Sequence, residues 1–340
     1  MGERAITRNR LIVFLTATVV LLGGLLIIAD WEAIRGVIGE SNWVYLLPAL
    51  AITAISYLCL SYSFAEVGRL MGIPIRRHRL AGIGYVSAVL NHLVQAGGVA
   101  GYGVRYALMR REGVSLNDVL AASILHFYLT SLAMQAFLPL GFVYLFFQAT
   151  LSRTVSIAFG ILTAALILIF VAESLLVFRS KTRRATLDWI GRVARRLFRK
   201  DLEQGLADFD AAMTRGIAGM RRHPKSGVLI GGLVLVDWFG SALALGFCFE
   251  ALGSPLTPAV LFTGFVIGVM AGVLSALPAG IGVQDGSMAG IFALLGVGFE
   301  EAVLAALLFR GVFYLIPYLV SLGFYWRLTS RTTPAEQVDP

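Results

Sequence analysis

The stretch GVMAGVLSALPAGIGVQDG, residues 268–286, begins as an apolar helix and then loses the residues that continue a helix. Pro278 has no amide hydrogen and its ring clashes with the preceding turn, so the helix is expected to break there. Gly280 and Gly282 follow, and glycine admits backbone angles that other residues avoid. The pattern predicts an unwound segment with Asp285 inside it. Such backbone is tolerated at membrane depth only where it is buried in protein or lines a polar cavity.

The composition of the whole chain is that of a polytopic membrane protein. Of its 340 residues, 58% are apolar and 14% are charged, and the mean hydropathy is +0.80. Soluble domains carry about 25% charged residues. The basic segment 179–225 holds 13 Lys or Arg and 5 Asp or Glu, an excess equal to the net charge of +8. Basic loops are typical of the cytoplasmic face of a membrane, so this charge gives no reason to expect nucleic-acid binding.

Six apolar segments are long enough to cross a bilayer, which takes about 20 helical residues. They are residues 11–28, 43–64, 118–147, 155–178, 227–249 and 300–326. The arginines that flank them indicate that both termini are cytoplasmic. We therefore expect residues 1–340 to form a single all-α, multi-pass domain in a bacterial-type inner (cytoplasmic) membrane.

Two more apolar segments are predicted to be re-entrant hairpins. Residues 80–111 hold an apolar run that is short for a crossing, then a glycine cluster that includes Gly97 and Gly98, and arginines flank both ends. This hairpin is expected to enter and leave on the cytoplasmic side. The second hairpin, residues 258–297, must then start and end outside.

A shift of 183 residues superimposes the two breaks, which suggests an inverted repeat with halves at about 43–147 and 226–326. Inverted repeats with a binding site near the midplane are a transporter architecture. Chance matching of glycine and alanine is the alternative explanation.

In the basic segment 179–225, apolar residues recur at steps of 3 and 4. This spacing predicts an amphipathic helix that lies on the anionic inner leaflet.

Charged and polar groups near the breaks are the candidate substrate-binding residues, since a charge at mid-membrane costs roughly 2.5–3.5 kcal/mol and therefore faces a cavity or a partner. They are Arg310, Asp285, Arg105, Gln284, Gly280, Gly282, Gly97, Gly98 and Asp237. Arg310 is expected to hold a lipid phosphate bidentately, with Arg105 as a second phosphate contact. The alternatives are a buried pair of Arg310 with Asp237 or Asp285, and a snorkelling Arg105.

The sequence allows two interpretations of His126. A histidine titrates near neutral pH, so His126 is a candidate for proton coupling. A hydrogen-bonded packing histidine is the alternative.

Several runs resemble the lysylphosphatidylglycerol synthase transmembrane family, also called UPF0104 or flippase-like. In the second half they are LPAGIGVQDG at 277–286, then Gly296 and Arg310, and in the first half Asn91, GGVAG at 97–101, Arg105 and RREGVS at 110–115. The resemblance covers about residues 10 to 328 and implies a membrane domain that moves a modified phospholipid between leaflets.

The chain departs from the family pattern in places that bear on the head group. Tyr102 stands where the family commonly has an acidic residue, Gln284 precedes Asp285 where Arg-Glu is usual, and His126-Phe127 replaces an acidic–basic pair. Only a short tail follows the last span, so the cytoplasmic aminoacyl-transferase domain of the best-known members is not expected.

The leading hypothesis is a lipid translocator for a phospholipid or a polyprenyl-phosphate-linked lipid. Two alternatives stay open: a membrane-embedded enzyme on lipid head groups with Asp285, Asp237 or His126 as general base, and a scaffold that recruits a cytoplasmic lipid-modifying enzyme through residues 179–225. The sequence has no phosphate-binding glycine loop, no zinc-protease motif and no nucleophile elbow. No catalytic residue, cofactor or metal is therefore predicted.

Overall fold

The computed structural model describes residues 41–93, 99–148, 153–198, 202–275 and 282–330, together with residues 39, 277 and 280. All regular structure in these ranges is helical. Three helical segments are long and apolar enough to cross a membrane: Trp43–Leu70, Pro224–Ala251 and Phe299–Thr329. Counting the bent pair Thr163–Phe178 and Ser180–Leu197 as one span gives up to four.

The three segments match three of the six expected crossings. They are formed by η1 (Trp43–Tyr45) with α3 (Leu46–Leu70), by α10 (Pro224–Ala251), and by α13 (Phe299–Phe309) continuing through η3 (Arg310–Leu315) into α14 (Ile316–Ser330). The expected crossings at 118–147 and 155–178 correspond to the helices α6 (Leu116–Gln148) and α7 (Arg153–Phe178). The expected first crossing, 11–28, lies outside the described residues. A total of six crossings stays a prediction.

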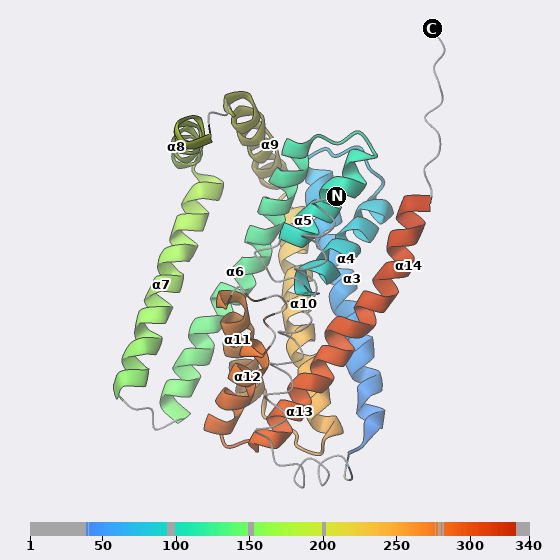
Figure 1. Cartoon of the computed structure of the whole chain (residues 1–340), viewed down its shortest axis with the longest axis vertical. Coiled ribbons are helices and arrows are strands. Elements are labelled where there is room, and N and C mark those ends of the chain that lie inside the picture. Colours follow the sequence, from blue (N-terminus) through green and yellow to red (C-terminus); the bar gives the residue numbers. More distant parts are fainter. Residues whose placement is uncertain are drawn as a thin grey trace.

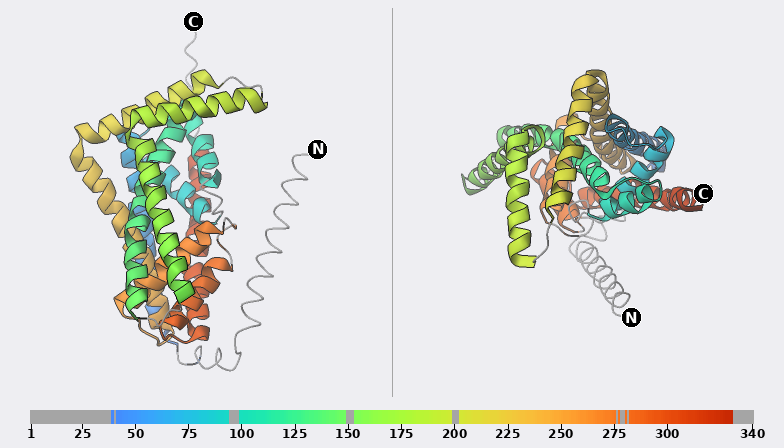
Figure 2. Two further views of the ribbon diagram at one scale, coloured as in Figure 1. Left: turned by 90° about the vertical axis from the view of Figure 1, so that its left-hand side faces the viewer. Right: turned by 90° about the horizontal axis from the view of Figure 1, so that it is seen from above.

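The long helices α3, α6, α7 and α10 run along the long axis of the molecule, and two shorter hairpins occupy opposite halves of it (Figure 1). One hairpin is α4 (Arg77–Leu93) with α5 (Val99–Arg110), and the other is α11 (Pro258–Leu274) with α12 (Val283–Leu294). The first lies in the half nearer to α8 (Ser180–Phe198) and α9 (Glu203–Arg222), which cross one end of the molecule (Figure 2). Opposite placement is what opposed hairpins require, while re-entry into a membrane and the inverted repeat stay predictions.

The second break is shorter than the sequence suggests. The helix resumes at Val283, so Gln284 and Asp285 lie in the first turn of α12 and not in an unwound segment. The reason is local: the Asp285 carboxylate accepts the amide of Gly282 at 3.1 Å, which caps the helix, and a carboxylate is favoured at a helix N-terminus. Gly280 and Gly282, with φ of +56° and +77°, carry the chain into that cap.

The first break is also shorter than expected. Helix α5 begins at Val99, so Gly101 lies within a helix. Its amide donates to Oδ1 of Asn91 on α4 at 2.8 Å, and a Cβ at Gly101 would collide with that side chain. Glycine is therefore needed here for close contact between the two arms of the hairpin. Gly97 and Gly98 lie outside the described residues.

The last span is irregular where it passes the middle of the molecule. Pro317 has no amide hydrogen to give to the carbonyl of Phe313 four residues earlier, and its ring crowds that carbonyl. The turn from Arg310 to Leu315 is π-helical, which widens the helix just before the proline. The hydroxyl of Tyr57 on α3 donates to the Phe313 carbonyl at 3.0 Å and replaces the missing bond.

The apolar face predicted in the basic segment is covered by protein in its second helix. Met213 and Ile217 of α9 are buried, and Phe209 and Met220 pack against the same hydrophobic cluster. Helix α9 contacts α3, α6 and α10. The expectation that the whole segment lies with its apolar face on the lipid therefore does not hold for α9, because this face caps the helix bundle.

Candidate functional site

A cavity of about 250 Å³ lies inside the helix bundle. Its walls come from the first hairpin, from α3, α6 and α10, and from α11, α13 and η3. The polar lining residues are Asn91, His92, Tyr102, Arg105, His126, Thr130, Ser131, Asp237, Ser241 and Tyr314. Leucine, valine, methionine and aromatic side chains make up most of the remainder. The cavity is therefore an apolar chamber with a small set of convergent polar groups, as ligand sites are.

Arg105 brings a buried positive charge to this cavity. Its residue is only 2% exposed, Nε donates to Oγ of Ser87 at 2.8 Å, and the guanidinium carbon lies 4.0 Å from the ring centre of Phe64. No carboxylate lies within 4.0 Å of Arg105 among the residues that the structure describes. A guanidinium offers five N–H donors, so the arginine keeps donors that an anion can use.

His126 contacts the guanidinium of Arg105. Its Nδ1 lies 3.5 Å from Nη2 of Arg105, and its Nε2 lies 2.7 Å from Oγ of Ser63. Because a guanidinium only donates, Nδ1 is the acceptor and Nε2 carries the hydrogen. Ser63 then donates to the carbonyl of Leu60 at 2.7 Å. Both ring nitrogens are occupied, and a second positive charge beside Arg105 is unfavourable, so this arrangement favours the packing interpretation of His126.

Asp237 brings an acidic side chain to the same cavity from α10. The residue is 7% exposed, and its Oδ1 accepts the hydroxyl of Ser56 at 2.5 Å. Within the described ranges no Lys, Arg or His lies within 4.0 Å of this carboxylate, so the expected alternative of an Arg310–Asp237 pair is not formed. The cavity thus holds an arginine and an aspartate that do not form an ion pair with each other in the described chain.

Arg310 and Asp285 form the other pair that the sequence left open. Nε of Arg310 donates to Oδ1 of Asp285 at 2.6 Å, and its guanidinium carbon lies 5.4 Å from the ring centre of Tyr314. Gln284 donates to the Tyr314 hydroxyl at 3.0 Å. Tyr314 also lines the cavity. The pair therefore joins the second hairpin to the last span and reaches the cavity through Tyr314, while Arg310 and Asp285 are not themselves lining residues.

An aromatic group on the cavity wall was not predicted from the sequence. The ring of His92 packs edge-on against Tyr57, Phe313 and Tyr314, and its Nδ1 lies 3.2 Å from the Tyr57 hydroxyl. Pro317 could have pointed to this group, because a proline inside an apolar span leaves a backbone carbonyl without its helical donor, and a neighbouring side chain must then donate to it. Among the described residues, no three His, Cys, Asp or Glu side chains gather as possible metal ligands.

These features define an all-α membrane protein with a cavity between its helices that is lined by ionisable side chains. Residues 13–321 match the family described as the lysylphosphatidylglycerol synthase transmembrane region, and the chain belongs to this family. A UPF0104 membrane protein of Methanothermobacter thermautotrophicus is 24% identical over 286 residues, which cover 82% of this chain and 84% of the relative. The similarity therefore extends over most of both proteins.

A second relative is similar over a shorter part. The phosphatidylglycerol lysyltransferase of Staphylococcus aureus strain COL is 30% identical over 87 residues, which are 26% of this chain and 10% of that enzyme. The shared part is thus a small fraction of the enzyme.

Proposed function

We propose that this protein moves a phosphate-bearing lipid between the two leaflets of a membrane. The observation that carries the proposal is Arg105, a buried guanidinium with no carboxylate within 4.0 Å in the described part of the chain, on the wall of an internal cavity. An unneutralised charge at membrane depth costs roughly 2.5–3.5 kcal/mol and marks substrate pathways. A lipid phosphate at Arg105 would supply the missing negative charge and accept two of its N–H groups.

Asp237 extends the proposal to the rest of the head group. It is buried on the same cavity without a cation within 4.0 Å among described residues, so a head group with both a phosphate and a cationic part fits the two charges. The name of the staphylococcal relative joins a phospholipid to a lysyl group, which carries an ammonium. An anionic head group without a cation is the alternative ligand, and a polyprenyl-phosphate lipid belongs to that class.

The two hairpins define the route that the proposal assigns to the lipid. We infer that α4–α5 and α11–α12 enter the membrane from opposite faces as halves of an inverted repeat, with both termini cytoplasmic. Each hairpin contributes a wall of the cavity, with Arg105 on the first and Phe265, Val269 and Val273 on the second. In the described chain the cavity and its charges then lie between two short helical pairs, where small shifts can open it to either side.

The test uses the full chain reconstituted in vesicles that contain a fluorescent phospholipid, with translocation followed by reduction of the label in the outer leaflet. Arg105→Gln should slow translocation at least tenfold, and Arg105→Lys should retain part of the rate because the charge remains. Arg110→Gln is the matched control, since Arg110 is exposed on the same helix. An unchanged rate for Arg105→Gln in folded protein would remove Arg105 from the path.

The same vesicles test the enzymatic alternative. Lipid recovered after incubation should have its original mass if the protein only translocates it. A covalently altered head group would instead support a membrane-embedded enzyme, with Asp237 as the carboxylate that faces the lipid.

A further inference from the structure

Helix α8 meets α7 at a sharp corner at one end of the molecule. The two helices are bent by 94° across a break at Arg179. Helix α8 therefore runs across the end of the bundle, and its far end extends past the described helices beneath it (Figure 2). If α7 crosses the membrane, a helix perpendicular to it runs along the membrane surface.

Unlike α9, helix α8 leaves apolar side chains uncovered. Trp189 is 58% exposed and Leu197 is 71% exposed, and Ile190 is exposed as well. The side of α8 that packs on α9 is formed by other residues, among them Gly191, whose Cα faces the Leu206 side chain of α9. The exposed apolar residues therefore lie beside this contact and are not covered by it.

The direction of this apolar face follows from Arg183. Its Nη1 donates at 2.6 Å to the carbonyl of Val177 in the last turn of α7, and its other nitrogens donate to Asp210 and Thr214 of α9, so the Arg183 side of α8 lies toward both α7 and α9. Positions seven residues apart in a helix differ by only about 20° around its axis. Arg183, Ile190 and Leu197 therefore share one face, and the two apolar residues point to the side on which α7 and the bundle lie.

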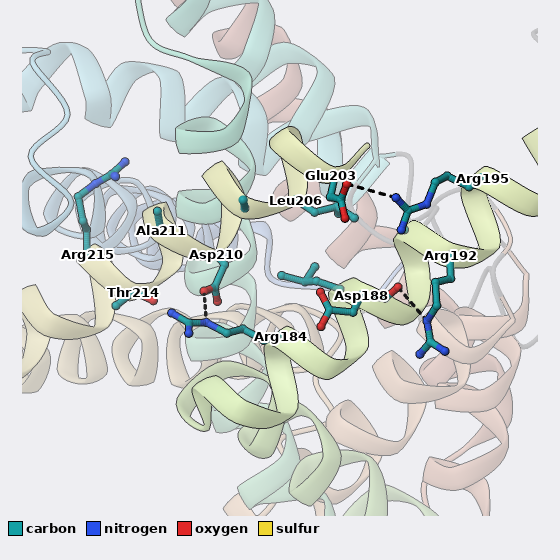
Figure 3. A pocket seen from close by; sticks show the side chains of 13 residues that line it. Arg184, Asp188, Arg192, Arg195, Glu203, Leu206, Asp210, Ala211, Thr214 and Arg215 are labelled. Carbon is teal, nitrogen blue, oxygen red and sulfur yellow. Dashed lines mark hydrogen bonds and ion pairs between the residues drawn. The ribbon is translucent and has the colours of Figure 1, made fainter. Parts of the chain in front are cut away.

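The rotation of α8 about its own axis is fixed by ion pairs with α9, of which Figure 3 shows the one between Arg184 and Asp210. Asp210 of α9 accepts Nε of Arg183 at 2.6 Å and Nε of Arg184 at 2.9 Å. Nη2 of Arg183 also donates to Thr214 at 2.7 Å. Burial raises the pKa of Asp210, but the bonds from Arg184 and Arg183 outweigh it and hold that pKa below the usual value.

The remaining faces of α8 are strongly basic. Its exposed charged side chains are Lys181, Arg184, Asp188, Arg192, Arg195 and Arg196. Five of these six are positive, which complements a negatively charged surface. A helix with an uncovered tryptophan and leucine face beside arginines has the composition that lies in the head-group region of an anionic bilayer.

We propose that α8 is a surface anchor that lies in the head-group layer of an anionic membrane, with Ile190 and Leu197 turned toward the acyl chains and Trp189 at the interface. The occupant of this face is the lipid surface itself. The proposal is independent of the cavity, because none of the α8 residues named here lines it. It assigns the amphipathic contact with lipid to α8 and leaves α9 as the protein-packed half of the segment.

The test places a nitroxide label at single positions of the full chain in lipid nanodiscs, after Cys59→Ser and Cys248→Ala remove the native thiols. Labels at 190 and 197 should be relaxed by oxygen, which concentrates in acyl chains, and little by a water-soluble nickel complex. Labels at 188 and 192 are the matched controls on the basic face and should show the reverse. The contrast should be larger in phosphatidylglycerol than in phosphatidylcholine discs.

Two outcomes would overturn the proposal. Equal nickel access at 197 and 188 would place the apolar face in water, and shielding of 197 from both reagents would show that a second copy of the chain covers it. A double variant, Ile190→Glu with Leu197→Glu, gives an independent measurement. Hydrogen exchange in α8 should rise at least fivefold in phosphatidylglycerol discs while exchange in α9 is unchanged, and an unchanged α8 would contradict the anchor.

Discussion

The hydroxyl of Tyr57 is expected to stabilise the last span because Pro317 removes a backbone donor there. We expect Tyr57→Phe to destabilise the protein while leaving ring packing against Phe313 and His92 in place. The variant keeps the aromatic ring and deletes the hydroxyl, which donates to the carbonyl of Phe313 at 3.0 Å and also lies 3.2 Å from Nδ1 of His92. That carbonyl then has neither Tyr57 nor an amide at position 317.

The magnitude follows from the burial of the orphaned group. Phe313 is 2% exposed, so water does not replace the lost donor. Leaving a buried acceptor unsatisfied costs about 1–3 kcal/mol. Pro317→Ala restores an amide hydrogen at the position that reaches the Phe313 carbonyl in a regular helix. In that background, Tyr57→Phe should cost at least about 1 kcal/mol less, since the orphan no longer arises.

The measurement is a double-variant cycle of reversible unfolding in mixed detergent micelles, followed by circular dichroism. Tyr85→Phe is a control, because its hydroxyl donates to the carbonyl of Pro317 and not to that of Phe313. If Tyr57→Phe costs the same with proline and with alanine at 317, within about 0.3–0.5 kcal/mol, the two residues are independent and the reasoning about the orphaned carbonyl is wrong.

Three further predictions concern other parts of the molecule. Asp285→Ala should cost about 3 kcal/mol in micelle unfolding because it breaks a largely buried ion pair, and adding Arg310→Met should recover most of it; an additive double variant would contradict this. Asp210, whose pKa in the folded protein is depressed, should stabilise the fold fully above its unfolded pKa of about 3.9, and this stabilisation should be lost as pH falls through the folded pKa. Asp210→Asn should remove this pH dependence of the thermal midpoint. Gly219→Ala should lower the thermal midpoint by several degrees because its Cβ would meet the carbonyl oxygen of Leu70, and Gly227→Ala, with open space around it, should not.

The order and type of the elements follow from features that are local in sequence. Runs of apolar residues about 20 long predict the long helices, a glycine cluster marks the break of the first hairpin, and proline with glycine marks that of the second. The limits of the breaks were less predictable. Whether Asp285 lies in a loop or in a helix depends on its bond to the Gly282 amide, and a proline–glycine pattern alone does not state that the carboxylate will cap.

The partners of the buried charges were beyond sequence reasoning because they are contacts between distant segments. Arg310 was left with two alternative carboxylates, and the structure brings it to Asp285 and leaves Asp237 with Ser56. Ser56 and Asp237 are 181 residues apart, and no spacing rule connects them. Of the ionisable residues that the sequence proposed, Arg105, His126 and Asp237 line the cavity, whereas Arg310 and Asp285 do not, and the binding roles of all five stay predictions.

Helix α6 borders both hairpins, touching α5 in one half of the molecule and α11 in the other. A rigid rod that tilts about its middle moves its two ends in opposite directions. A tilt of α6 that draws it away from α5 therefore presses it toward α11, and the reverse tilt does the opposite. In the proposed translocator, α6 would thereby couple separation from one hairpin to closer contact with the other.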